Sequence, residues 1–411
     1  MPKFERVLVL ILLIGLAACT VDRTSAPNPV SPSATATIAP ATLIPATGTP
    51  TLTPLPPTAT DTLVPTPTAT ERLLPIRNPD LEAEVNQLAS AFLKQTHTVG
   101  LSIALVVHNP VTDHMDATLL NYGLASEADG RAATFDTVYE VGSITKVFTG
   151  ILLAEAVNEG KVKLDDPIQA YLPSGVHAPM FGSVPITLDN LATHRASLPR
   201  DLDSDNITDL YSFLNTYQLS HVPGSEYAYS NLGYSLLGDI LARLYGMDYA
   251  TLEFQSVSQP LGLLDTRQVL SEEQKSRLAQ GYTYDGSPAA YFPDSGAMSG
   301  AGYLHSTLAD MTRFLIANMQ PDPTSLAESI RLAQTMQAEG SGPRTGVGLG
   351  WEIEHPGAPT ERFWKSGGTS GFTSYISFEE DGSYGFVLLS NGQYVNYLVP
   401  GLIRILTENS Q

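Results

Sequence analysis

Residues 372–390 read FTSYISFEEDGSYGFVLLS, and this stretch predicts two antiparallel β-strands joined by a tight turn. The turn residues EDGS at 380–383 separate two runs that are rich in β-branched and aromatic side chains. Far upstream, residues 99–108 (VGLSIALVVH) predict a buried strand, and residues 117–123 predict its hairpin partner. We therefore expect an antiparallel sheet that takes strands from both ends of the folded region.

Helical patterns lie outside and between these strands. Residues 80–95 (DLEAEVNQLASAFLKQ) have apolar side chains at helical spacing, and residues 143–159 predict a strongly apolar helix. Residues 394–407 predict a closing helix with a kink at Pro400, and residues 161–340 read mostly as helices and loops. The expected class is α+β: an antiparallel sheet built from N- and C-terminal strands and flanked by helices, with an inserted, mostly helical lobe.

The charge of the chain excludes one large class of partner. The 411 residues carry a net charge of −20, and residues 1–75 hold as many acidic as basic side chains, so the excess lies on the remainder. Such a surface repels phosphate backbones, and we expect no nucleic-acid binding. The single cysteine excludes an internal disulfide and a Cys-based zinc site, and the sequence has no HExxH, Walker or GxSxG motif. No metal site is expected.

The first residues predict export. Residues 1–18 have Lys3 and Arg6 before an apolar run, the pattern of a secretory signal. Their end, Leu-Ala-Ala followed by Cys19, resembles a bacterial lipoprotein processing site. The resemblance implies lipid on Cys19 and an extracytoplasmic protein at a cell membrane or cell surface. The alternative is a plain secretory signal with a chance cysteine.

A linker separates this signal from the folded region. Residues 19–78 are rich in proline and threonine with few charges, a composition that does not bury enough apolar surface to fold. We expect an extended tether that holds a domain of residues 79–411 away from a surface.

A serine and a lysine open the helix predicted at 143–159. In EVGSITKVFT (140–149), Ser143 precedes Lys146 by three residues, so both side chains lie on one helical face. Burial and the helix N-terminus both favour the neutral amine that a general base needs. Backbone N–H groups at the same helix end are suited to bind an oxyanion. The alternative is a helix-capping serine followed by a surface lysine.

Two further motifs carry suitable chemistry, although each alone is weak. Tyr229 and Asn231 stand at i and i+2 in AYSNLGY, where both side chains face one cavity if the chain is extended. A phenol close to ammonium groups ionises more easily and transfers protons. Residues 364–369, WKSGGT, place Lys365 and a hydroxyl on a predicted sheet edge, which suits carboxylate binding. The alternative for the last motif is a glycine turn before a strand.

The order of these motifs resembles that of the serine β-lactamase and penicillin-binding-protein family. SxxK opens a helix, YxN follows, and K-[S/T]-G lies on a C-terminal strand. The YxN centre resembles the class C β-lactamase and D-Ala-D-Ala carboxypeptidase branch. The likeness spans roughly residues 82–408 and includes the phrases THRASLP, PGSEYAYSNLGYSLLGDIL and KSGGTSGF.

The resemblance implies a role for each residue. Ser143 is the expected nucleophile, Lys146 assists its deprotonation, and Tyr229 transfers the proton to the leaving group. Asn231, Lys365, Ser366 and Gly367 are expected to bind substrate, and the backbone N–H groups of Ser143 and Gly368 are expected to form the oxyanion hole. The resemblance implies no metal or organic cofactor and a small-molecule or peptide substrate with a carboxylate; we expect a monomer.

Two departures from the family pattern concern the cleft. Ser366 replaces the common threonine and keeps the hydroxyl. Residues 194–198 (HRASL) lack the glycine that the family often has two residues before the proline, which bears on substrate preference and not on acylation. We read His194 in this segment as structural.

Three functions stay open. The first is a serine hydrolase that acts through an acyl-enzyme on β-lactams or D-Ala-D-Ala-type peptides. The second is a carboxylesterase for small acyl esters with the same Ser-Lys-Tyr site. The third is a non-catalytic module that binds peptidoglycan or acts as a sensor. The presence of Ser143, Lys146 and Tyr229 argues against this third function.

Overall fold

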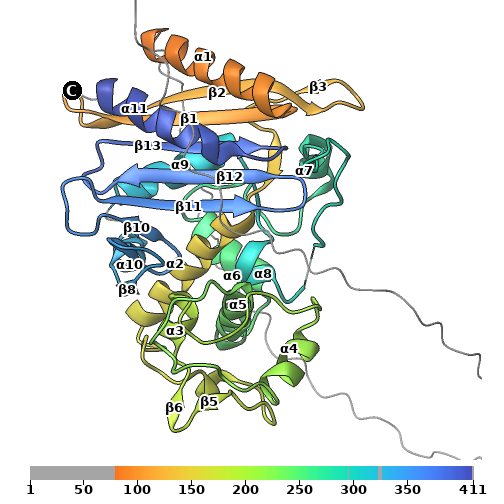
Figure 1. The fold of residues 1–411 in the computed structure, drawn as a ribbon, viewed down its shortest axis with the longest axis vertical. Coiled ribbons are helices and arrows are strands. Elements are labelled where there is room, and N and C mark those ends of the chain that lie inside the picture. The colour runs from red at the N-terminus through yellow and green to blue at the C-terminus, as the bar shows by residue number, and fades with distance from the viewer. Residues whose placement is uncertain (1–78, 295, 323–325, 410–411) are drawn as a thin grey trace, which may run out of the picture. The chain divides into compact units, whose positions relative to one another are not determined.

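The computed structural model describes residues 79–294, 296–322 and 326–409 (Figure 1). The signal at 1–18, Cys19 and the linker to residue 78 therefore lie outside the described residues. Within the described ranges, no helix has both the length and the apolar character to cross a membrane.

A nine-stranded antiparallel sheet forms the centre, in the order β3-β2-β1-β13-β12-β11-β10-β9-β8. Its strands are β1 (Gly100–Asn109), β2 (His114–Ser126), β3 (Arg131–Ala132), β8 (Ala338–Glu339), β9 (Thr345–Val347), β10 (Glu352–Glu354), β11 (Arg362–Gly368), β12 (Thr373–Glu379) and β13 (Tyr384–Ser390). β1 pairs with β13, so strands from the two ends of the domain meet at the middle of the sheet. This confirms the α+β class and the hairpin predicted from residues 372–390.

Side chains alternate between two cores on either side of the sheet. Leu101 and Ile103 of β1 pack into one cluster, and Ala104 and Val106 pack into the other. The smaller cluster lies under α1 (Pro79–Thr96) and α11 (Val399–Asn409), which cover the same face in Figure 1. A strand that is buried on both faces is an almost continuous apolar run, which explains the sequence of 99–108.

The chain end differs from the kinked helix predicted at 394–407. A 3₁₀ turn, η4 (Val395–Leu398), comes first, and α11 begins at Val399. Pro400 therefore lies in the first turn of α11, where its missing N–H removes no intrahelical bond and no kink results.

The other face of the sheet packs against α2 (Thr145–Asn158), α9 (Leu308–Met319) and the inserted segment. The remaining helices are α3 (Leu188–Ala192), α4 (Ile207–Leu214), α5 (Asn231–Tyr245), α6 (Tyr249–Glu253), α7 (Glu272–Arg277), α8 (Ser299–Gly302) and α10 (Ala327–Gln334), with helical turns η2 (Ile168–Tyr171) and η3 (Phe254–Ser258). Short strand pairs also occur, made by β4 (Val138–Glu140) with β7 (His305–Thr307) and by β5 (Met180–Phe181) with β6 (Val184–Pro185).

Candidate active site

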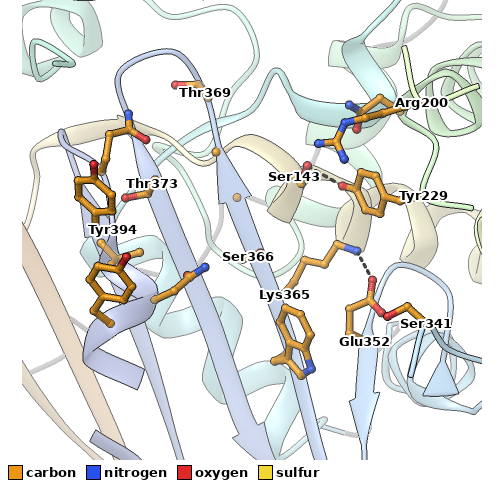
Figure 2. A pocket seen from close by; sticks show the side chains of 18 of the residues that line it. Ser143, Arg200, Tyr229, Ser341, Glu352, Lys365, Ser366, Thr369, Thr373 and Tyr394 are labelled. Carbon is orange, nitrogen blue, oxygen red and sulfur yellow. Dashed lines mark hydrogen bonds and ion pairs between the residues drawn. The ribbon is translucent and has the colours of Figure 1, made fainter. Parts of the chain in front are cut away.

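Ser143 lies at the junction between the sheet and the helical segment. It is the middle residue of the 3₁₀ turn η1 (Gly142–Ile144), which leads directly into α2, so the predicted helix starts two residues late. Its hydroxyl oxygen accepts a hydrogen bond from Lys146 Nζ at 3.0 Å. The same oxygen accepts a hydrogen bond from the Tyr229 hydroxyl at 2.8 Å (Figure 2). An amine and a phenol from two distant segments therefore converge on the Ser143 oxygen.

Lys146 projects from the first turn of α2 and is completely buried. Its ammonium donates to Ser143 Oγ, to Asn231 Oδ1 at 2.8 Å and to the Ala301 carbonyl at 2.6 Å. Burial lowers the pKa of Lys146 to about 8, because the protein interior disfavours the charged form, and the nearby Lys365 charge acts in the same direction. In the neutral state, the amine has a lone pair for the Ser143 proton while its two hydrogens still reach the two amide oxygens.

Tyr229 stands just before α5, and its phenol lies among cations. Burial raises the pKa of Tyr229, but the charges of Lys146 and Lys365 outweigh burial and hold this pKa below its usual value of 10. The two ammonium nitrogens lie 5.2 and 5.4 Å from the ring centroid, and the Arg200 guanidinium carbon lies 5.1 Å from it. The phenol is therefore suited to hold and release a proton next to Ser143.

His194 supports this tyrosine from behind. Its ring centroid lies 4.2 Å from that of Tyr229, and its Nδ1 accepts a hydrogen bond from the Ser230 backbone N–H at 3.1 Å. Burial and the charge of Lys365 hold the pKa of His194 well below its usual value, so the ring is neutral. The geometry agrees with a structural histidine that fixes the segment carrying Tyr229.

Ser197 stands two residues before Pro199, at the position where the family often has a glycine, and its backbone has an unusual conformation. Ser197 has φ +56°, in the left-handed region that favours glycine. Its hydroxyl oxygen accepts hydrogen bonds from the backbone N–H groups of Ser220 and His221, both at 3.2 Å. These hydrogen bonds stabilise a backbone conformation that a glycine would adopt without strain. The neighbouring Arg195 donates to the carbonyls of Gly224 and Glu339 and so ties the cleft rim together.

Asn231 is the first residue of α5, and its side chain bridges two parts of the site. Its oxygen accepts from Lys146, and its Nδ2 donates to Asp201 Oδ1 at 2.7 Å. Because an aspartate fixes the amide orientation, the oxygen is turned toward the lysine.

Strand β11 forms the opposite wall of the site. Lys365 is buried at 2% exposure, with Nζ 3.1 Å from Glu352 Oε1 on the neighbouring strand β10. The Tyr227 hydroxyl donates to the same carboxylate oxygen at 3.2 Å. Ser366 and the two glycines after it line the cleft beside this pair.

Two glycines allow η1 to approach β11. Gly142 has φ +52°, and a methyl group there would lie 2.7 Å from the Gly368 backbone nitrogen. A methyl group on Gly367 would lie 2.0 Å from the Val141 carbonyl oxygen. The nucleophile segment and the strand end are in contact only because both positions lack a side chain.

These groups open into one cleft of about 820 Å³. Its lining includes Ser143, Arg200, Tyr227, Tyr229, Asn231, Tyr284, Ser341, Glu352, Trp364, Lys365, Ser366, Gly367, Gly368, Thr369, Thr373, Gln393, Tyr394, Val395, Asn396 and Tyr397. Among the described residues, no cluster of His, Cys, Asp and Glu is arranged to hold a metal ion. The arrangement suits nucleophilic attack by a serine with an adjacent amine and phenol.

Comparison with known proteins identifies the family of the chain. The Beta-lactamase family profile matches residues 85–404, which is most of the chain. The chain belongs to the Beta-lactamase family. It is therefore a serine hydrolase, as the motifs predict.

Individual relatives are named as D-alanine carboxypeptidases or as β-lactamases. D-alanyl-D-alanine-carboxypeptidase/endopeptidase AmpH of Escherichia coli K12 is 27% identical over 363 residues, covering 82% of this chain and 91% of that protein. A Beta-lactamase of Pseudomonas fluorescens is 28% identical over 351 residues, covering 77% of this chain and 95% of that protein. The solved structure of a Beta-Lactamase/D-Alanine Carboxypeptidase from Pseudomonas syringae aligns with a TM-score of 0.72 at 25% identity, covering 81% of this chain and 99% of that one.

The structure brings together every residue that the sequence places in the site, and it adds others. Glu352, Arg200 and Tyr227 were not predicted, although all three line the cleft. Arg200 directly follows the THRASLP phrase, and Tyr227 lies two residues before Tyr229, so proximity to a motif is a usable signal for both. Glu352 directly follows GLGW (residues 348–351), another phrase of the resemblance, so the same signal applies to it. Its pairing with Lys365 had no signal in the sequence, because that pairing depends on β10 lying beside β11.

Proposed function

We propose that this enzyme hydrolyses β-lactams or D-Ala-D-Ala-type peptides through an acyl-enzyme on Ser143. The observation that carries the proposal is the hydroxyl of Ser143, which lies within hydrogen-bond reach of a buried amine and of a phenol with a lowered pKa. The names of the relatives support the substrate class.

The groups suggest an order of proton transfers. Ser143 Oγ attacks the carbonyl carbon and gives its proton to Lys146, while the backbone N–H groups of Ser143 and Gly368 bind the resulting oxyanion. The carbon–nitrogen bond then breaks, and Tyr229 supplies a proton to the leaving nitrogen. Water attacks the acyl-enzyme, the acid leaves, and Ser143 regains its proton. Asn231 holds Lys146 in place.

We assign substrate binding to the β11 wall. Lys365 and Ser366 supply a cation and a hydroxyl for the substrate carboxylate, and Gly367 lets the substrate backbone approach. Arg200 is a further cation in the cleft, and its side chain is 68% exposed.

The pairing of Lys365 with Glu352 favours a second candidate. An internal carboxylate already neutralises the lysine, which weakens the attraction for a substrate carboxylate. Small neutral acyl esters would then be suitable substrates for the same Ser143, Lys146 and Tyr229.

Intact-mass spectrometry over time distinguishes these substrates. The domain of residues 79–411 and the full chain are each mixed with a penicillin, a D-Ala-D-Ala peptide or a short ester. Rapid loss of a penicilloyl adduct indicates a β-lactamase, whereas a persistent adduct with peptide turnover indicates a penicillin-inhibited peptidase. Turnover of the ester without any penicilloyl adduct selects the esterase.

Substitution of the nucleophile tests the residue assignment. Ser143→Ala should abolish every adduct, while the exposed Ser225→Ala should leave adduct formation intact. An adduct that persists in Ser143→Ala, located by peptide mapping on another serine, would remove the assignment.

We also propose that the protein is a monomer held at a membrane by lipid on Cys19. The position of the only cysteine directly after Leu-Ala-Ala supports this. Cells fed an alkyne-tagged fatty acid should label the wild-type chain and not Cys19→Ala, and light scattering of the released domain should give the mass of one chain. Equal labelling of both forms would refute the anchor.

A further inference from the structure

Three exposed tyrosines gather in the catalytic cleft away from the nucleophile. Tyr284 is 73% exposed, Tyr397 is 70% exposed and Tyr394 is 38% exposed, and all three line the same cleft as Ser143. The centroids of Tyr394 and Tyr397 lie 5.5 Å apart with nearly parallel rings, and Tyr284 meets Tyr394 edge-on at 5.2 Å. We call these three residues the tyrosine cluster.

The cluster is assembled from two distant segments. Tyr284 lies in the loop after Tyr282, whereas Tyr394 and Tyr397 lie between β13 and α11. In Figure 2, Tyr394 lies on one side of the ends of β11 and β12, and Ser143 with Tyr229 lies on the other side. The cleft therefore joins a reacting centre to an aromatic surface across the ends of β11 and β12.

Neither burial nor hydrogen bonding to the described residues accounts for the tyrosine cluster. None of the three hydroxyls has a hydrogen-bond partner among the described residues. Tyr394 also has φ +78°, a conformation that costs energy for a residue other than glycine and that recurs at binding sites. Large exposed aromatic faces that line a cleft are typical of places where a ligand ring packs.

The surroundings of the cluster indicate an uncharged ligand group. Thr373, Gln393 and Val395 line this part of the cleft and carry no charge. The charged lining residues Arg200, Glu352 and Lys365 lie with Tyr229 at the other side in Figure 2. A charged group would therefore be held beside Ser143, and a neutral ring would fit against the tyrosines.

We propose that the tyrosine cluster is a subsite for an uncharged aromatic ring carried by the substrate, and that it gives the enzyme a preference for ring-bearing substrates. The proposal rests on the proposed acyl-serine function, since the ring must belong to the molecule that Ser143 attacks. The ring stacks on Tyr397 or Tyr284 while the scissile carbonyl lies at Ser143.

Two matched substrate pairs test the preference. Phenylacetyl-D-Ala-D-Ala against acetyl-D-Ala-D-Ala places the ring on the acyl side, and acetyl-D-Ala-D-Phe against acetyl-D-Ala-D-Ala places it on the leaving side. Each pair is also offered as the corresponding ester, so that either chemistry yields a rate. The wild-type enzyme should favour the ring-bearing member of one pair about tenfold in kcat/KM.

Substitutions then locate the subsite. Tyr284→Ala and Tyr397→Ala, singly and together, should reduce that ratio, and the double variant should remove it. Phe181→Ala is the matched control, because Phe181 is an exposed aromatic residue at 40% exposure on the β5–β6 hairpin, and it should keep the wild-type ratio. Tyr394 is left intact because of its backbone conformation.

Labelling of each variant with a methyl fluorophosphonate reports Ser143 reactivity without a substrate ring. Normal labelling with no ring preference in either pair, or with a preference that persists in the double variant, would overturn the tyrosine subsite alone. A wild-type enzyme without label on Ser143 would instead refute the acyl-serine function on which the subsite rests.

Discussion

Lys365 Nζ lies 3.1 Å from Glu352 Oε1, and both side chains are largely buried, at 3% and 12% exposure. The cation that the sequence assigns to a substrate carboxylate is therefore already paired with a carboxylate of the protein. Glu352 therefore competes with a substrate carboxylate for the charge of Lys365.

Glu352→Gln should strengthen the binding of carboxylated substrates by removing this competitor. We expect KM for a D-Ala-D-Ala peptide to fall about tenfold with little change for a neutral ester, a difference of about 1.4 kcal/mol. The unfolding free energy should fall by about 3 kcal/mol, since a buried lysine loses its partner. Steady-state kinetics and urea denaturation measure the two effects.

Glu354→Gln is the control for this variant. Glu354 lies two residues along β10 and pairs with Arg362, outside the cleft lining. It should lower stability without changing the preference between charged and neutral substrates. If both variants change KM alike, the competition does not exist.

Lys365→Ala should lower kcat/KM for carboxylated substrates far more than for neutral substrates. Loss of a charge-assisted contact costs about 2 kcal/mol, or roughly thirtyfold in kcat/KM. The double variant Lys365→Ala with Glu352→Gln avoids a lone buried carboxylate and should show the same selectivity. Equal losses on peptide and ester would remove the carboxylate-binding role.

The pH dependence of acylation should follow the deprotonation of Lys146. The pKa of Lys146 is lowered to about 8, mainly by burial, so the amine is protonated and inactive as a base below this pH. The acylation rate should therefore rise with pH and level off above pH 8. Stopped-flow acylation between pH 6 and 9.5 measures this, and a flat profile contradicts a lysine base.

Tyr229→Phe should reduce kcat/KM by about 10²- to 10⁴-fold, the range for loss of a general acid–base group. The substitution removes the hydroxyl that lies 2.8 Å from Ser143 Oγ and keeps the ring against His194. Tyr211→Phe, which removes a hydroxyl bonded to Asp239 on α5, is the control and should retain activity. Comparable losses in both variants would indicate a general structural effect.

A comparison of Gly142→Ala with Gly160→Ala should separate the effect of backbone strain from the effect of a displaced Ser143. Gly142 and Gly160 both have positive φ, but only at Gly142 would a methyl group meet another backbone atom, 2.7 Å away on Gly368. Gly160→Ala should cost about 1 kcal/mol of stability and leave kcat/KM intact. Gly142→Ala should also lower kcat/KM at least about a hundredfold by displacing Ser143 from β11. Similar activities in the two variants would show that the close approach does not matter.

Local patterns were good predictors where short-range rules dominate. The 372–390 hairpin and the helix at 80–95 appear in the structure because turn chemistry and apolar periodicity decide such elements. The prediction of a kink at Pro400 was wrong, because the preceding 3₁₀ turn moves the start of the helix to Val399. The position of a helix start depends on packing at the helix end, which local patterns do not specify.

The sequence by itself determined the chemical groups of the site. Ser143 and Lys146 lie one turn apart, and Lys365 stands beside its glycines on a strand, so local spacing was sufficient to nominate them. Only the tertiary structure decided the environment of those groups: the burial that lowers the pKa of Lys146, the pairing of Glu352 with Lys365, and the tyrosine cluster in the same cleft. These features depend on contacts between segments far apart in the chain, and a protonation state or a partner is set by whatever surrounds a side chain in space, which a linear pattern does not specify.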